Sequence, residues 1–137
     1  NLLTICKAIN QIKNSSSIPL VVIGNGGRYK EEIKKYIQSN SLQEKIIFLS
    51  ENSEAIQNKE FKSSAHFPAI YQMAEAMIYP STFEGFGIPI LEALFSRIPV
   101  ITSNVSCMPE AGGNAAAYID SFDYNSLSLK MEAIANG

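Results

Sequence analysis

The stretch Tyr79–Gly113, which reads YPSTFEGFGIPILEALFSRIPVITSNVSCMPEAGG, decides the fold of this chain. The apolar run at residues 77–79 predicts a buried strand that ends at a loop. Gly85 and Gly87 allow a positive φ and let the backbone approach a ligand closely. Pro89 suits the first turn of a helix, so we predict that the glycine turn leads directly into a helix N-terminus.

Two glutamates flank this predicted turn, Glu84 just before the helix and Glu92 about one turn inside it. The start of a helix carries unpaired N–H groups and positive charge, which attract phosphate and other electron-rich oxygens. Ionised carboxylates only accept hydrogen bonds, so they suit hydroxyl groups and not phosphate. A ligand with phosphate in its middle and hydroxyl-rich sugars at its ends satisfies both, and a nucleotide sugar is such a ligand.

Residues 83–120, FEGFGIPILEALFSRIPVITSNVSCMPEAGGNAAAYID, resemble the donor-binding segment of retaining GT-B glycosyltransferases, the glycosyl transferases group 1 family. The Glu-x7-Glu motif of that family is present as Glu84 and Glu92. Several further positions match in order and spacing: Gly85, Phe86, Gly87, Pro99, Val100, Ile101, Ser103, Asn104, Pro109, Glu110 and Gly112.

The resemblance implies roles for the residues of the motif. Glu84, as the catalytic residue, hydrogen-bonds the hydroxyls of the donor sugar, and Glu92 holds the ribose hydroxyls. The backbone amides of Gly85, Phe86, Gly87 and Ile88 bind sugar or phosphate oxygens. The resemblance further implies transfer of a hexosyl group with retention, without a metal or another cofactor, in polysaccharide, lipopolysaccharide or glycoconjugate synthesis.

Strands and helices are predicted to alternate along the whole chain. Helices are expected at residues 2–13, 29–39, 69–76 and 126–135 and after Pro89, and strands at 19–23, 46–49, 77–79, 99–101 and 115–119. This alternation predicts an α/β fold, a Rossmann-like parallel sheet with helices on both faces. Ligands bind such sheets at the carboxyl ends of the strands, where the glycine turns 24–27 and 85–87 are expected. The strand at 19–23 is predicted to be buried on both faces.

The chain is interpreted as one nucleotide-sugar donor domain, residues 1–137, and as the C-terminal half of a GT-B fold. Members of the family carry an acceptor-binding domain upstream, followed by a strand whose Arg and Lys hold the donor diphosphate. Neither is in this sequence, so we expect a sheet that lacks its first strand. We therefore expect the isolated chain to bind nucleotide without turning over, and a saccharide or lipid-linked acceptor to bind through the absent domain.

Composition excludes several other classes of protein. A formal net charge of −2 argues against a nucleic-acid partner. No apolar run reaches the roughly 20 residues of a membrane span, and peripheral membrane contact is assigned to the absent domain. Cys6 and Cys107 lack metal-ligand spacing and are interpreted as reduced thiols. We expect a cytoplasmic protein, at most peripheral at the inner face of the membrane.

Some assignments stay open at this point. Gly24, Gly26 and Gly27 suggest a dinucleotide fingerprint, but Tyr29 occupies the third glycine position, so a tight turn is favoured. A glycosidase that uses Glu84 and Glu92 as its carboxylate pair is the alternative enzyme class.

Four further residues are interpreted as secondary to the motif. Glu110 is either a donor contact or a cap, and His66, the only histidine, is interpreted as a loop residue. Tyr71 and Met73 are predicted to pack in the core.

Overall fold

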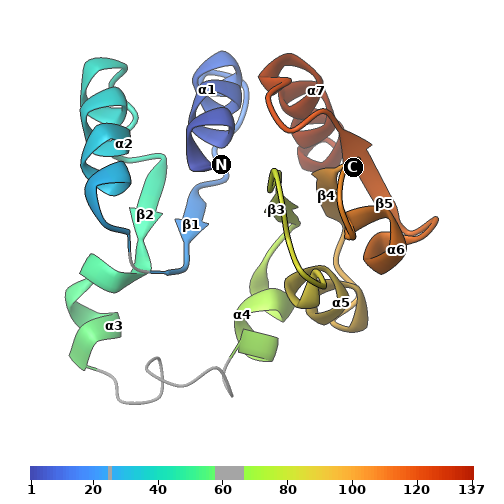
Figure 1. Cartoon of the computed structure of the whole chain (residues 1–137). Coiled ribbons are helices and arrows are strands. Elements are labelled where there is room, and N and C mark those ends of the chain that lie inside the picture. Colours follow the sequence, from blue (N-terminus) through green and yellow to red (C-terminus); the bar gives the residue numbers. More distant parts are fainter. Residues whose placement is uncertain (25, 58–66) are drawn as a thin grey trace.

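The structure, a computed structural model, describes residues 1–24, 26–57 and 67–137, in which parallel strands alternate with helices (Figure 1). His66 and Asn25 lie outside the described residues. The helices are α1 (Leu2–Ile12), α2 (Arg28–Ser39), α3 (Ser53–Gln57), α4 (Phe67–Met73), α5 (Ile88–Phe95), α6 (Met108–Gly112) and α7 (Tyr124–Ala135), with a 3-10 helix η1 (Leu49–Glu51). The strands are β1 (Leu20–Val22), β2 (Ile46–Phe48), β3 (Met77–Tyr79), β4 (Val100–Ser103) and β5 (Ala116–Ile119).

The strands form two parallel sheets, one of β1 and β2 and one in the order β3-β4-β5. Helices α1, α2 and α7 lie on one side of the strands, and α3, α4, α5 and α6 lie on the other (Figure 1). The predicted α/β class with a parallel arrangement and helices on both faces is therefore confirmed. The sheet is nevertheless divided, because β1 and β3 are not hydrogen-bonded neighbours.

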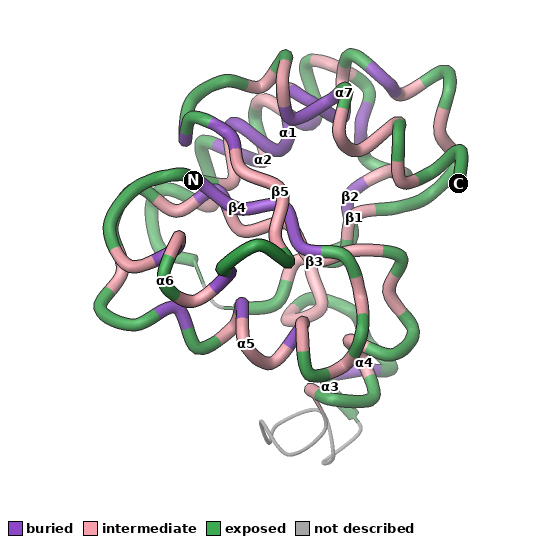
Figure 2. Tube along the Cα trace, turned by 90° about the vertical axis from the view of Figure 1, so that its right-hand side faces the viewer, coloured by how far each residue is buried: buried purple, intermediate pink, exposed green. Residues whose placement is uncertain are grey.

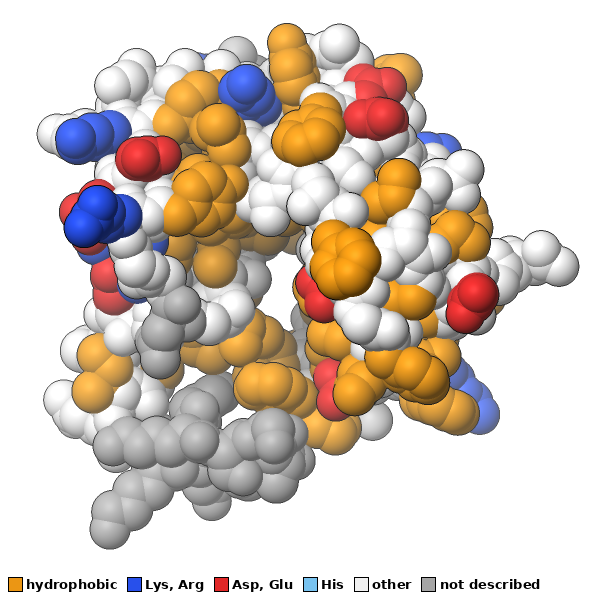
Figure 3. Space-filling model, in the orientation of Figure 1, with side chains coloured by type: hydrophobic (Ala, Val, Ile, Leu, Met, Phe, Trp, Pro, Cys, Tyr) orange, Lys and Arg blue, Asp and Glu red, His pale blue; other side chains and the backbone are white. Residues whose placement is uncertain are grey.

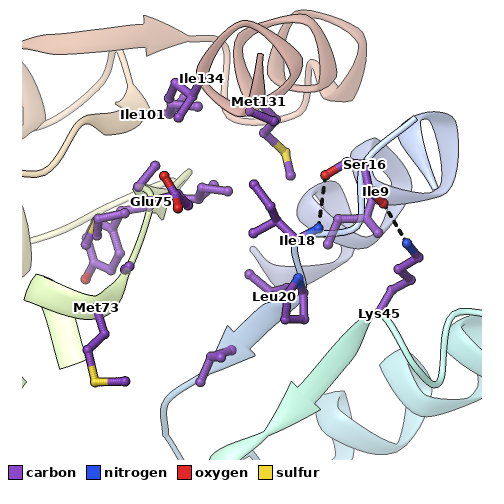
Figure 4. Close-up of a pocket in the computed structure, with 18 of the residues that line it drawn as sticks. Ile9, Ser16, Ile18, Leu20, Lys45, Met73, Glu75, Ile101, Met131 and Ile134 are labelled. Atoms are coloured by element: carbon purple, nitrogen blue, oxygen red, sulfur yellow. Dashed lines mark hydrogen bonds between the residues drawn. The ribbon is translucent and has the colours of Figure 1, made fainter. Parts of the chain in front are cut away.

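A cavity of about 740 Å³ separates β1 from β3. Figure 3 shows a hollow between the two halves of the molecule, with hydrophobic side chains on its walls. Leu20 of β1, Ile101 of β4 and Met131 of α7 lie around the cavity (Figure 4). The same cavity is bordered by Tyr71 of α4 and Tyr79 of β3.

The prediction that the strand at residues 19–23 is buried on both faces is wrong. Val21 is 43% exposed and Ile23 is 42% exposed. The reason is that β1 has a neighbour on only one side, so its second edge borders the cavity.

Two hydrophobic clusters hold the elements in place. The larger one joins α1, α2 and α7 to the strands, and its fully buried members include Leu42, Ile101 and Leu127. The smaller one packs α5 against β4 and α6 through Ile90 and Met108. Figure 2 shows buried residues gathered on β4 and α1. The smaller cluster fixes the position of α5, the helix that carries Glu92.

Two local predictions also need correction. Met73 was expected in the core, but its side chain is 88% exposed because it lies at the last residue of α4. Residues 109 and 110 were expected in a loop, whereas they form the first turn of the short helix α6, with Pro109 in a position that needs no N–H partner. Glu110 is exposed in that turn.

Candidate functional site

The glycine turn leads into α5 as the sequence predicts. Gly87 caps the helix with φ +80°, Pro89 stands in the first turn, and the amide of Ile90 donates to the Gly87 carbonyl at 3.0 Å. Among the described residues, the amides of residues 85–88 find no hydrogen-bond acceptor. Free amides at the positive end of a helix provide a place for phosphate or sugar oxygens.

The two glycines of the turn have different reasons to be glycine. Gly87 has a positive φ, and a Cβ there would lie 3.1 Å from the Cβ of Ala111. Gly85 does not have a positive φ, and a Cβ there would have no heavy atom within 4 Å. The expectation of positive φ is therefore confirmed at Gly87 and wrong at Gly85, whose missing side chain leaves open space beside the backbone.

Glu84 is half-buried, and its carboxylate is held by two hydroxyl groups. Its Oε1 accepts from the Tyr79 hydroxyl at 2.6 Å and from the Ser81 Oγ at 2.8 Å. In the part of the chain that the structure describes, no hydrogen bond reaches the other oxygen, Oε2. One oxygen of this carboxylate is thus fixed by the protein, and the other keeps its capacity to accept hydrogen bonds.

The backbone of Glu84 is tied to the loop between β4 and α6. The Ser106 Oγ donates to the Glu84 carbonyl at 2.8 Å, and the Cys107 thiol donates to the same carbonyl at 3.3 Å. The segment that follows β3 is held by Ser103 of β4 and by Ser121, which follows β5, because both donate to the Ser81 carbonyl. These contacts join the carboxyl ends of β3, β4 and β5 at the site.

Glu92 lies on α5 and is also half-buried. Its Oε2 accepts from the Tyr71 hydroxyl of α4 at 3.1 Å. Unlike Glu84, it has a single hydroxyl donor among the described residues. The arrangement of this second carboxylate therefore depends on the packing of α4 against α5.

Both tyrosines have pKa values above the usual range. Burial and the hydrogen bond to Glu92 raise the pKa of Tyr71 to about 12. Burial and the hydrogen bond to Glu84 raise the pKa of Tyr79 even further. An ionised phenol beside a carboxylate would add a second negative charge, so both phenols stay protonated at neutral pH and act as donors.

Three apolar side chains in or next to the segment with the free amides are exposed to solvent. Phe83, Phe86 and Ile88 are 78%, 66% and 57% exposed. A neutral, partly apolar rim with a few fixed polar groups is typical of small-molecule sites. All the predicted site residues from Glu84 to Glu92 thus lie on one continuous segment, and the structure orients their polar groups with partners from other segments.

The second glycine turn also follows the carboxyl end of a strand, in this case β1. Beside it, Lys30 contacts Glu51 at 2.7 Å, the Ser50 hydroxyl at 3.1 Å and the face of the Phe48 ring at 4.8 Å. The Lys30 ammonium is therefore already engaged by η1.

Three hydroxyl residues were not assigned to the site from the sequence: Tyr71, which was predicted to pack in the core, Tyr79 and Ser81. Tyr79 and Ser81 lie within five residues of Glu84, so a search for donors near the motif would have found them. Tyr71 is 21 residues from Glu92, and only the packing of α4 on α5 brings the two together. The described residues include no group of His, Cys, Asp and Glu that could hold a metal ion. They also include no helix of the length and apolarity needed to cross a membrane.

Comparison with known proteins identifies a matching family. Residues 1–136 match the model of the family described as glycosyl transferases group 1. The match extends over nearly the whole chain, including both sheets and the segment with the two glutamates.

Individual relatives are similar over parts of the chain. The O-antigen chain mannosyltransferase RfbU of Salmonella typhimurium is 32% identical over 120 residues, which are 88% of this chain and 31% of the relative. The O-antigen chain mannosyltransferase B of Escherichia coli is 44% identical over 64 residues, 47% of this chain and 17% of the relative. An MMP alpha-(1->4)-mannosyltransferase of Mycolicibacterium hassiacum is 30% identical over 77 residues, 56% of this chain and 19% of the relative. The chain thus spans less than a third of the length of each of these relatives.

Proposed function

The chain belongs to the group 1 family of glycosyl transferases, and from this membership we propose that it is the donor-binding part of an enzyme that transfers a hexosyl group from a nucleotide sugar to an acceptor hydroxyl. The observation that carries the proposal is the pair Glu84 and Glu92 on either side of the free amides of residues 85–88. One oxygen of each glutamate accepts from protein hydroxyls, two for Glu84 and one for Glu92, and the other oxygen accepts no hydrogen bond from the described residues. Hydroxyl groups of a ligand can occupy the open oxygens, and a diphosphate can lie at the start of α5.

In the proposed reaction, Glu84 accepts hydrogen bonds from the hydroxyls of the donor sugar and Glu92 from those of the ribose. The amides of Gly85, Phe86, Gly87 and Ile88 bind sugar or phosphate oxygens. The acceptor oxygen forms a bond to the anomeric carbon of the donor. The bond between that carbon and the phosphate oxygen breaks, and its electron pair leaves with the nucleoside diphosphate. The acceptor proton passes to a phosphate oxygen. Stabilising the charge of the leaving group and orienting the donor are then the main tasks of the protein.

We further propose transfer with retention, from the face that the diphosphate leaves, and without a metal ion. Two of the relatives are named as O-antigen chain mannosyltransferases, which favours mannose as the hexose and an O-antigen chain as the acceptor. We propose that a saccharide or lipid-linked acceptor binds through a part of the protein outside this chain, and that a lipid-linked acceptor would bring the reaction to the inner face of the membrane.

The divided sheet supports the proposal that this chain is one part of the donor domain. The facing edges of β1 and β3 and the apolar cavity between them fit one more parallel strand. Asn1, where α1 begins, donates through its side chain to the carbonyl of Ser121, just beyond the carboxyl end of β5. A strand that entered this gap in the parallel direction would end at the same edge of the sheets, where the glycine turn that leads into α5 also lies.

Calorimetry and turnover assays on the full-length protein test this function. GDP-mannose, UDP-glucose and ADP-glucose, with their nucleoside diphosphates, are titrated into the wild type and into Glu84→Gln and Glu92→Gln. We expect binding of one nucleotide, a loss of turnover in Glu84→Gln of roughly 100-fold or more, and weaker nucleotide binding in Glu92→Gln. A folded protein that binds none of these nucleotides contradicts the donor site.

Three further experiments test the absence of a metal ion, the retention of configuration and the inactivity of the isolated chain. Unchanged turnover after treatment with a chelator is expected if no metal takes part. NMR of the product reports whether the anomeric configuration of the donor is kept. The isolated chain is expected to show no turnover, and hydrolysis of a simple glycoside without a nucleotide sugar would instead support the glycosidase.

A further inference from the structure

Each of the two glutamates of the site is held by a tyrosine from a different element. The Tyr79 hydroxyl, at the carboxyl end of β3, lies 2.6 Å from Oε1 of Glu84. The Tyr71 hydroxyl, on α4, lies 3.1 Å from Oε2 of Glu92. Both rings are half-buried and line the cavity between the sheets, so packing restricts their positions.

A glutamate side chain that no partner holds samples several rotamers, and a ligand must then select one of them. A buried donor on one carboxylate oxygen restricts this freedom before the ligand arrives. It also leaves the second oxygen with its acceptor sites unoccupied. A fixed carboxylate with one open oxygen binds a sugar hydroxyl at a defined place, which an unrestrained carboxylate does not.

The two carboxylates are not held equally well. Glu84 has a second donor, the Ser81 Oγ at 2.8 Å, on the same oxygen that Tyr79 contacts. Glu92 has Tyr71 alone among the described residues. Removing one hydroxyl is therefore enough to release Glu92, whereas two must be removed to release Glu84.

We propose that Tyr71 and Tyr79 are positioning residues, Tyr71 for the recognition of the nucleotide by Glu92, and Tyr79, together with Ser81, for the orientation of the transferred sugar by Glu84. The proposal rests on the proposed function, because it assigns each tyrosine to one half of the donor. The proposal predicts different kinetic effects for the nucleotide half and the sugar half of the donor. Tyr71 controls affinity for the nucleoside diphosphate, and the Tyr79 and Ser81 pair controls turnover of the bound donor.

The test compares Tyr71→Phe with the double variant Tyr79→Phe, Ser81→Ala in the full-length protein. Phenylalanine keeps the ring that lines the cavity and removes only the hydroxyl. We expect Tyr71→Phe to raise KM for the nucleotide sugar and Kd for the nucleoside diphosphate about 10-fold, with kcat within about 2-fold of wild type. We expect the double variant to lower kcat about 10-fold with Kd for the nucleoside diphosphate unchanged.

Calorimetric stoichiometry counts the sites that are folded and able to bind, so kcat is expressed per binding site. A merely structural role of the tyrosines lowers the number of sites and leaves Kd and kcat per site unchanged. Tyr118→Phe serves as the matched control, because its hydroxyl donates to the Gly113 carbonyl at 2.7 Å and contacts neither glutamate. It is expected to keep wild-type kinetics.

Two outcomes overturn different statements. The positioning role is overturned if Tyr71→Phe keeps the wild-type Kd and the double variant keeps the wild-type kcat per site while Glu84→Gln and Glu92→Gln are impaired. The proposed function stands in that case. Wild-type kinetics in Glu84→Gln and Glu92→Gln overturn the proposed function itself.

Discussion

At the scale of single residues, alanine substitutions at the two glycines of the turn test different properties. The substitution at Gly87 tests stability, and the one at Gly85 tests whether the open space beside the backbone binds the ligand. An alanine at Gly87 must adopt φ +80°, which costs an L-residue roughly 1–2 kcal/mol, and its Cβ also crowds Ala111 at 3.1 Å. We expect Gly87→Ala to lower the free energy of unfolding by about 1–3 kcal/mol in urea titrations.

Gly85→Ala is the control for that measurement, because its Cβ meets no atom within 4 Å and needs no positive φ. We expect its free energy of unfolding to stay within about 0.5 kcal/mol of wild type, while its affinity for the nucleotide sugar falls. Equal losses of stability in the two variants would show that the turn does not impose the conformation at Gly87.

The two cysteines are both free thiols, and they differ in how deeply they are buried. Cys6 is fully buried in α1, and burial raises the pKa of its thiol to about 11. Cys107 is half-buried beside the Glu84 carbonyl. Since the thiolate is the reactive species, we expect iodoacetamide at pH 8 to modify Cys107 at least about 10-fold faster than Cys6 in the native chain.

Peptide mass spectrometry measures both alkylation rates. Denaturation in urea is expected to bring the two rates close together, because Cys6 then loses its burial. Fast modification of Cys6 in the absence of denaturant would contradict the packing of α1 in the core.

At the scale of elements, α7 begins with a side-chain cap. One carboxylate oxygen of Asp123 accepts from the amides of Asn125 at 3.1 Å and Ser126 at 2.9 Å. Asp123→Ala leaves both amides without this partner, so we expect the free energy of unfolding to fall by about 1 kcal/mol and Tm by about 2–5 °C. Calorimetric melting measures the change.

Asp123→Ser is the matched control for the cap, since serine also accepts from these amides. It is expected to lose much less stability than Asp123→Ala. The loss reaches the core because α7 carries the fully buried Leu127 and packs along α1. A neutral Asp123→Ala would mean that α7 is held by packing alone.

Elements set by short-range signals were predictable from the sequence. Gly87 and Pro89 mark the start of α5 through local backbone chemistry, and the apolar run at residues 77–79 marks β3. The Glu-x7-Glu spacing likewise indicated Glu84 and Glu92 as candidate site residues, and their roles stay a prediction. The role of Tyr71 was not predictable, because its contact with Glu92 depends on the angle at which α4 packs against α5.

At the scale of the whole molecule, the division of the sheet was only partly predictable. The sequence indicated parallel strands and a sheet without its first strand, and the family resemblance supplied the second expectation. The exposure of Val21 was missed, because the apolar run of β1 is the same whether one neighbour or two are present. Whether a strand lies at an edge depends on which segments lie beside it. β1 pairs with β2 on one side only, and the apolar run of β1 does not reveal this.

The divided sheet leaves two backbone amides as specific reporters of a missing neighbour. Leu20 donates to the Lys45 carbonyl at 2.8 Å and Met77 to the Pro99 carbonyl at 2.9 Å, so these residues direct their backbone groups toward β2 and β4. Successive residues of a strand direct these groups to opposite sides. Val21 and Ile78 therefore direct theirs toward the cavity between β1 and β3.

Hydrogen exchange at these amides tests whether the preceding polypeptide fills the cavity as a parallel strand. We expect the amides of Val21 and Ile78 to exchange at least about 100-fold more slowly in the full-length protein than in this chain, because a sixth strand would accept their hydrogen bonds. The amides of Val22 and Tyr79 face the existing neighbours, so they report any general stabilisation by the rest of the protein. Selective protection of Val21 and Ile78 beyond that of Val22 and Tyr79 supports the inserted strand, and equal changes at all four amides contradict it.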